Sequence, residues 1–130
     1  MPIIKGIIVG HGNFSEVMLK TAEQIVGKQD YVELVSNTRM SCALLNEELK
    51  KVVENTNKHE TIVFVDLPGG SCTISCYNLL KNREDLNVIC GINLPVLIEF
   101  FMLREKYPAE QLVPILVKKG KESIFKLEKK

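Results

Sequence analysis

His11 and Asp66 are the residues of this sequence best placed to do chemistry. His11 stands between Gly10 and Gly12 just after an apolar, β-branched run, and Asp66 closes another such run. The flanking glycines leave space around the imidazole. A carboxylate that accepts a hydrogen bond from one ring nitrogen fixes the tautomer and leaves the lone pair of the other nitrogen free to attack. The pair therefore predicts an activated histidine nucleophile.

A simpler interpretation of each residue stays open. Gly-His-Gly is a short motif that also fits a tight turn in which His11 has no chemical role, and Asp66 also fits a turn or a helix cap. The loop Gly69-Gly70-Ser71 follows the aspartate and leads into a helical pattern. Its N–H groups and the Ser71 hydroxyl could bind phosphate oxygens, although Ser71 also fits an ordinary N-cap.

The sequence contains neither a P-loop lysine motif nor a cluster of metal ligands at typical spacing, so we expect no cofactor and no metal. Cys72 and Cys76 alone are a weak zinc signal, and we expect them to be core or half-buried thiols. His59 lies in a polar stretch and is expected to be a solvated surface histidine.

The elements that must position these residues alternate along the chain. Short apolar, β-branched runs typical of buried strands cover 3–9, 31–35, 61–66 and 87–91, and patterns with helical spacing cover 15–26, 43–53, 72–80 and 95–103. Residues 36–38 between them supply turn and cap chemistry. This alternation predicts an α/β fold with an open, mostly parallel sheet and helices on both faces. Parallel strands bring their carboxyl ends to one edge, so His11, Asp66 and the Leu94-Pro95 turn should meet there.

The last quarter of the chain allows two interpretations. Residues 112–117 could form an edge strand that tolerates Pro114, or belong to a helix that begins near Pro108. Residues 123–127 alternate weakly and could form one short final strand.

Length and composition limit the class of protein. The 130 residues are 45% hydrophobic, which fits a single domain over residues 1–130. Seventeen basic against sixteen acidic residues leave a net charge of +1, which disfavours nucleic acid as a partner. Neither a transmembrane-length apolar run nor a signal peptide is present, so we expect a cytoplasmic protein with reduced cysteines.

Three motifs, taken together, resemble those of a known family. They are Ile8-Val9-Gly10-His11-Gly12, Val65-Asp66-Leu67-Pro68-Gly69-Gly70-Ser71 and Gly91-Ile92-Asn93-Leu94-Pro95-Val96-Leu97. In this order and spacing they resemble the IIA component of the mannose-type (mannose, fructose, sorbose, N-acetylgalactosamine) family of the bacterial phosphoenolpyruvate-dependent sugar phosphotransferase system, over essentially the whole chain.

The resemblance implies a phosphocarrier, which acts as a phosphotransferase component of that system. His11 would accept a phosphoryl group at Nε2 from the carrier HPr and pass it to a IIB component that serves membrane sugar-transport subunits. Asp66 would orient the imidazole, and Gly12, Gly69, Gly70 and Ser71 would surround the phosphate. The family fold is commonly a homodimer that exchanges the carboxyl-terminal strand, which favours a helix over 108–118 and a strand near 124–127. The protein would be cytoplasmic and peripherally associated with the transporter, with IIB expected as a separate chain.

The sequence departs from the family pattern at two positions and leaves other functions open. Cys72 stands where the family usually has proline, and Val96 where it usually has methionine. The alternatives are a phosphocarrier domain for dihydroxyacetone kinase, which the second motif disfavours, and a regulatory module that reads the phosphorylation state. A small hydrolase is disfavoured because the sequence offers no fuller set of nucleophile, base and orienting residue.

Overall fold

One parallel sheet organises the molecule. The computed structural model describes residues 3–55, 59–81, 83 and 85–129. Within these residues the strands β1 (Lys5–Gly10), β2 (Val32–Ser36), β3 (Thr61–Val65) and β4 (Leu86–Cys90) pair in the order β2-β1-β3-β4, and every pair is parallel. The predicted open parallel sheet is confirmed, with strand bounds within two residues of those expected.

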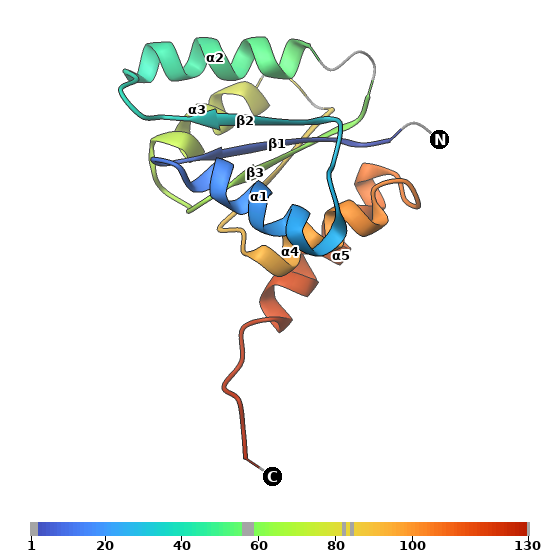
Figure 1. Ribbon diagram of the computed structural model, residues 1–130. Helices are drawn as coiled ribbons and strands as arrows, with labels where there is room; N and C mark the ends of the chain where they lie inside the picture. Colours follow the sequence, from blue (N-terminus) through green and yellow to red (C-terminus); the bar gives the residue numbers. More distant parts are fainter. Residues whose placement is uncertain (1–2, 56–58, 82, 84, 130) are drawn as a thin grey trace.

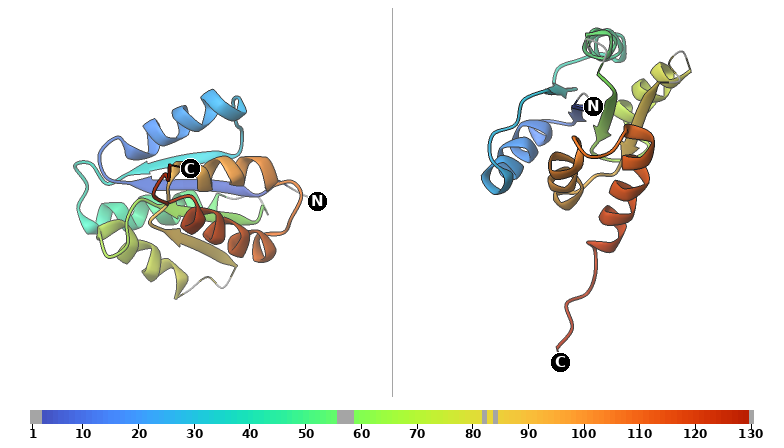
Figure 2. Two further views of the ribbon diagram at one scale, coloured as in Figure 1. Left: turned by 90° about the horizontal axis from the view of Figure 1, so that it is seen from below. Right: turned by 90° about the vertical axis from the view of Figure 1, so that its right-hand side faces the viewer.

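Helices cover both faces of this sheet, also as predicted (Figures 1 and 2). One face carries α1 (Phe14–Val26), α4 (Leu94–Leu103) and α5 (Ala109–Glu122), and the other carries α2 (Cys42–Glu54) and α3 (Ser71–Leu80). The strands are apolar on both faces because alternate residues serve two cores: Ile8 and Phe64 pack in the first, Ile7 and Val63 in the second.

The strand register brings the ends of β1 and β3 together. Val9 lies opposite Val65 on one side and opposite Val35 on the other. Beyond this register the Asp66 N–H donates to the Val9 carbonyl at 3.2 Å. The residue that follows β3 is therefore held beside the turn that follows β1.

The helix expected over 108–118 forms, one residue later than predicted. Helix α5 begins at Ala109 after the N-cap Pro108 and contains Pro114 in its interior. The predicted strand near 124–127 does not form within this chain, because residues 124–129 leave α5 as an extended tail that points away from the sheet (Figure 1). Its backbone has no neighbouring strand in the described part of the chain, and Ile124, Phe125 and Leu127 are 76%, 73% and 85% exposed.

The amino-terminal ends of the strands are joined by a buried arginine. Arg104, 2% exposed, donates from Nη1 to the Ile4 and Tyr31 carbonyls and from Nη2 to the carbonyl of Asp30 and the side chain of Gln29, at distances between 2.5 and 3.4 Å. We refer to this group as the Arg104 clasp. It ties the start of β1 to the loop that precedes β2.

His59 lies at this same end, and the expectation of a solvated side chain is wrong. Its Nδ1 is 2.6 Å from the Ile3 carbonyl, and its ring centroid is 4.8 Å from that of Tyr31. The polar sequence around His59 gave no sign of either contact, since both partners come from distant segments.

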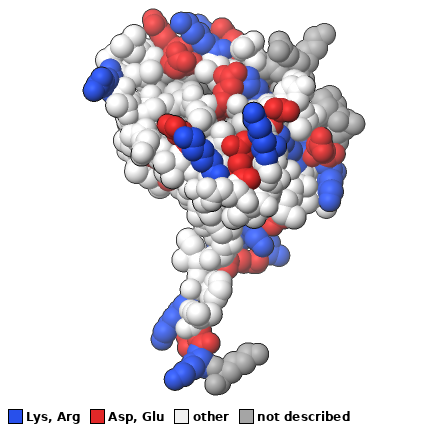
Figure 3. All heavy atoms as spheres, in the orientation of Figure 1, with Lys and Arg blue, Asp and Glu red and all other residues white. Residues whose placement is uncertain are grey.

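The surface shows no dominance of one charge on the face in Figure 3, where Lys and Arg side chains alternate with Asp and Glu. None of the helices within the described residues is long and apolar enough to cross a membrane.

Candidate functional site

The turn after β1 holds His11 at the carboxyl edge of the sheet. The strand ends at Gly10, α1 begins at Phe14, and the Phe14 N–H donates to the His11 carbonyl at 3.1 Å. Gly12 has φ +56°, a left-handed conformation that glycine adopts without strain. The short turn therefore leaves the His11 side chain, 42% exposed, open to an incoming group.

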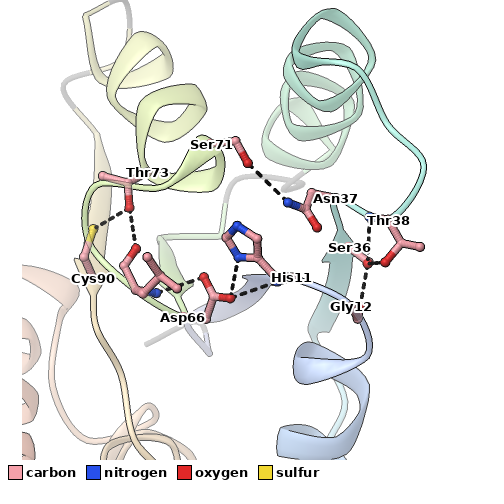
Figure 4. A network of polar contacts seen from close by, with 10 residues as sticks. His11, Gly12, Ser36, Asn37, Thr38, Asp66, Ser71, Thr73 and Cys90 are labelled. Carbon is pink, nitrogen blue, oxygen red and sulfur yellow. Dashed lines mark hydrogen bonds and ion pairs between the residues drawn. The ribbon is translucent and has the colours of Figure 1, made fainter.

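Asp66 binds His11 through both the ring and the backbone (Figure 4). Its Oδ2 lies 2.7 Å from Nδ1 and 2.8 Å from the His11 backbone nitrogen, while Oδ1 accepts from the Leu67 N–H at 2.8 Å. Desolvation by itself would raise the pKa of Asp66, but these hydrogen bonds and the charge of His11 outweigh it, so the pKa lies below its ordinary value. An ionised acceptor fixes the proton on Nδ1 and leaves the lone pair on Nε2.

Gly70 brings the loop before α3 directly against the imidazole. A Cβ atom added to Gly70 would lie 3.2 Å from Cε1 and 3.5 Å from Nε2 of His11. Gly70 is also the N-cap of α3, so Ser71 is the first helical residue and not the cap that its type suggested. The first N–H groups of α3 have no hydrogen-bond partner inside the helix. They lie beside the imidazole ring and can bind an anion.

Asn37, at the carboxyl end of β2, is the residue that sequence reasoning missed. Its Nδ2 donates to Ser71 Oγ at 3.2 Å, and its backbone N–H donates to the Gly10 carbonyl at 3.1 Å. Its neighbour Ser36 donates from Oγ to the Gly12 carbonyl at 2.6 Å. We predicted only turn chemistry for 36–38. The strand order explains its place: β2 adjoins β1 in a parallel sheet, so the residues after both strands share one edge.

The predicted site residues fall into two groups, those that lie around the imidazole and those that shape the turns. Asp66 and Ser71 lie on either side of the His11 imidazole (Figure 4), and Gly70 faces the ring. Gly12 and Gly69 instead take positive φ values of +56° and +83°, with no described atom within 4 Å of an added Cβ. The latter two glycines thus form the turns that hold the other four.

Cys72 adds a thiol close to His11 and Asp66. One nitrogen of His11, one oxygen of Asp66 and Cys72 Sγ all lie within 4.8 Å of one another. Burial, and secondarily the charge of Asp66, raises the pKa of the Cys72 thiol to about 11. The sequence predicted no cluster of metal ligands because these residues are far apart along the chain, whereas the fold gathers three.

The chain is similar to components of sugar phosphotransferase systems. The model of the family described as "PTS system fructose IIA component" matches residues 5–116. The mannose-specific EIIAB component of Escherichia coli K12 is 32% identical over 131 residues, covering 95% of this chain and 40% of the relative. The chain thus spans about two-fifths of the length of that protein.

A shorter relative and a solved structure agree in length with this chain. The fructose-specific EIIA component of Bacillus subtilis is 25% identical over 113 residues, covering 85% of this chain and 77% of the relative. The crystal structure of phosphotransferase system component EIIA from Streptococcus agalactiae superposes with a TM-score of 0.87 at 30% identity, covering 95% of this chain and 97% of that one.

Proposed function

Since the chain belongs to the fructose- and mannose-type IIA family of the sugar phosphotransferase system, we propose that it carries a phosphoryl group on Nε2 of His11. The observation that carries this proposal is the 2.7 Å contact between Nδ1 and Asp66 Oδ2, on an imidazole that is 42% exposed. This contact supports a proton on Nδ1, which faces the carboxylate, and a free lone pair on Nε2.

The transfer step follows from this arrangement. The Nε2 lone pair of His11 attacks the phosphorus atom of a phosphohistidine on HPr, and the P–N bond of the donor breaks as the new P–N bond forms. The ring becomes cationic, and Asp66 stabilises it through the Nδ1–H hydrogen bond. Attack by a nucleophile of the IIB component on the same phosphorus then returns His11 to its neutral form.

The start of α3 supplies partners for the phosphoryl oxygens. The first-turn N–H groups and the Ser71 hydroxyl provide donors, and a negative charge at a helix N-terminus gains about 0.3–1 kcal/mol. Gly70 leaves the approach free, since a side chain there would crowd Nε2. We propose that this relay operates in the cytoplasm, beside the membrane subunits that admit the sugar.

The direct test is the mass of the protein after phosphorylation. Incubation with phosphoenolpyruvate, enzyme I and HPr should add one acid-labile phosphate, which peptide mapping should place on His11. The His11→Ala variant should gain none. The chain has two histidines, so His59→Gln is the matched control and should still gain one phosphate. A folded His11→Ala variant that is still labelled would overturn the assignment.

We also propose that the chain forms a homodimer through its carboxyl-terminal tail. In the described part of the chain β4 pairs only with β3, which leaves its outer edge free. A groove beside this edge is lined by apolar residues that include Val88, Ile92, Val96 and Val117. Ile124 lines this groove in its own chain, and the exposed side chains of Phe125 and Leu127 beyond it match the same groove on a second copy.

Sedimentation of the full chain tests the dimer. Phe125→Glu should shift the protein towards the monomer, because it places a charge within the apolar contact. Lys126→Glu changes the charge of a neighbouring residue that is also exposed, and should leave the dimer in place. Equal sedimentation of both variants and the unmodified chain would contradict the proposal.

A further inference from the structure

Three side chains around the proposed phosphorylation site offer the ligand types that zinc prefers. An imidazole nitrogen of His11, a carboxylate oxygen of Asp66 and the thiol of Cys72 lie within 4.8 Å of one another. Thiolate, imidazole and carboxylate are the common ligands of Zn²⁺. We propose that His11, Asp66 and Cys72 form a binding site for a thiophilic divalent metal such as Zn²⁺, and that the bound metal excludes phosphorylation of His11.

The geometry requires little rearrangement. With Zn–S near 2.3 Å and Zn–N and Zn–O near 2.0–2.2 Å, tetrahedral ligand atoms lie roughly 3.5 Å from one another. Since no pair of these atoms is more than 4.8 Å apart, the widest pair has to close by at most roughly 1.3 Å, whereas Nδ1 and Oδ2, at 2.7 Å, have to open by roughly 0.8 Å if Nδ1 is the ligand. Changes of side-chain torsion can supply movements of this size. Three protein ligands leave a fourth position for water.

The burial of the ligands differs in a way that suits entry from solvent. Cys72 is fully buried and the Asp66 side chain is 7% exposed, whereas the His11 side chain is 42% exposed. A metal ion can therefore arrive along the imidazole side and meet two ligands that are already shielded from water. The thiol also sets the selectivity, because sulfur ligands favour Zn²⁺ over Mg²⁺ and Ca²⁺, which prefer oxygen.

Metal and phosphoryl group compete for the same atoms. A metal that binds a nitrogen of His11 and an oxygen of Asp66 either occupies Nε2 or replaces the hydrogen bond that fixes the tautomer. The inhibitory part of this inference rests on the proposed phosphocarrier function, whereas metal binding does not.

Cobalt binding tests the site without any phosphotransfer. Titration of the metal-free protein with Co²⁺ should produce the near-ultraviolet charge-transfer band of a thiolate–cobalt bond, and Zn²⁺ should abolish it by displacement. Cys72→Ser should lose the band and bind Zn²⁺ at least about tenfold more weakly, since even loss of an outer-shell partner costs that much. Mg²⁺ and Ca²⁺ should not displace cobalt.

Controls separate this site from other thiols and from misfolding. Cys42 and Cys90 are exposed, so the double variant Cys42→Ser/Cys90→Ser removes accessible thiols and should retain the band. Cys72→Ala provides a second test, with circular dichroism to show that both Cys72 variants are folded. Absence of the band from the unmodified protein, or its persistence in a folded Cys72 variant, overturns the proposal.

The inhibition of His11 phosphorylation by the metal is measured in a separate experiment. Zn²⁺ should lower the rate of His11 phosphorylation in the unmodified protein and leave Cys72→Ser unaffected, which also shows that enzyme I and HPr tolerate the metal. A protein that binds Co²⁺ through Cys72 but accepts no phosphate in a buffer that contains Mg²⁺ and no zinc or cobalt would contradict the phosphocarrier function alone. Equal inhibition of both proteins would contradict the competition.

Discussion

At the scale of single residues, one carboxylate oxygen fixes both the backbone and the ring of His11. Asp66 Oδ2 accepts from the His11 backbone N–H and from Nδ1, at 2.8 and 2.7 Å. The same atom thus sets the position of the turn and the tautomer of the side chain. A substitution at residue 66 should therefore affect both the turn after β1 and the proposed phosphoryl transfer.

Asp66→Asn should slow phosphorylation of His11 by about 100-fold or more. The amide cannot act as an ionised acceptor, so neither the Nδ1–H tautomer nor the cationic ring is stabilised, and loss of an orienting carboxylate in a serine protease costs about 10⁴-fold. Single-turnover phosphorylation by phospho-HPr measures the rate. A folded Asp66→Asn variant within threefold of the unmodified protein would exclude an orienting role.

Asn37→Asp should slow phosphorylation by about tenfold or more. The Asn37 amide donates to Ser71 Oγ, which leaves the hydroxyl hydrogen free for a phosphoryl oxygen. A carboxylate would instead accept that hydrogen and add negative charge near the incoming group, and a hydrogen bond to a charged group contributes about 1.5–3 kcal/mol. The matched variant Asn37→Ala, which adds no charge, should lose less than fivefold in the same assay, and equal losses would contradict this role of charge.

At the scale of elements, the loop before α3 combines two glycines with different tasks. Gly69 has φ +83° and open space around it, whereas Gly70 has an ordinary φ of −88° and faces the imidazole. The first glycine serves the backbone conformation, and the second leaves room for the reaction. A substitution at Gly69 should therefore lower the stability of the fold, whereas one at Gly70 should lower the rate of phosphorylation.

Gly70→Ala should reduce the phosphorylation rate at least about tenfold with little change in thermal stability, because the new methyl group would press on Cε1 of His11 at 3.2 Å and lie beside Nε2 at 3.5 Å. Gly69→Ala should do the reverse, since a left-handed conformation costs about 1–2 kcal/mol in a residue with a side chain. Rate and melting temperature measured on both variants check the pair. Loss of stability in Gly70→Ala with normal phosphorylation would contradict the roles given to the two glycines.

Sequence patterns predicted the elements better than their ends and contacts. The strands ending at His11 and Asp66 were found because buried parallel strands are continuous apolar runs. Three features escaped prediction. Asn37 binds Ser71 through a pairing of elements that periodicity does not reveal. The N-cap of α3 lies at Gly70 and not at Ser71. Residues 124–127 carry a strand pattern but have no strand to join among the described residues. Patterns along the chain do not report contacts between distant segments, so they could not predict these features.

At the scale of the whole molecule, the Arg104 clasp joins segments from three parts of the chain at one end of the sheet. Its guanidinium also packs 5.5 and 5.1 Å from the ring centroids of Phe100 and Phe101. These contacts anchor α4 to the beginning of β1 and β2.

Arg104→Met should destabilise the protein by about 3 kcal/mol or more, because the buried Ile4 carbonyl and the part-buried carbonyls of Asp30 and Tyr31 lose their donor. The control Arg83→Met breaks a surface ion pair with Asp85 and should cost less than about 1 kcal/mol. Urea unfolding measures both. At temperatures where Arg104→Met is folded, its His11 should still be phosphorylated at the normal rate, and a slower rate in the folded variant would show coupling between the two ends.

The position of the clasp has a consequence for how this sequence can change over evolutionary time. It lies before β1 and β2, whereas His11 and Asp66 lie after β1 and β3, so strands of five or six residues, about 16–20 Å long, separate the two groups. Effects of substitutions at such distances add nearly independently. A substitution near the clasp that stabilises the fold can therefore offset one near His11 that destabilises it. Substitutions that change the binding of partners near His11 can then accumulate while the protein stays folded.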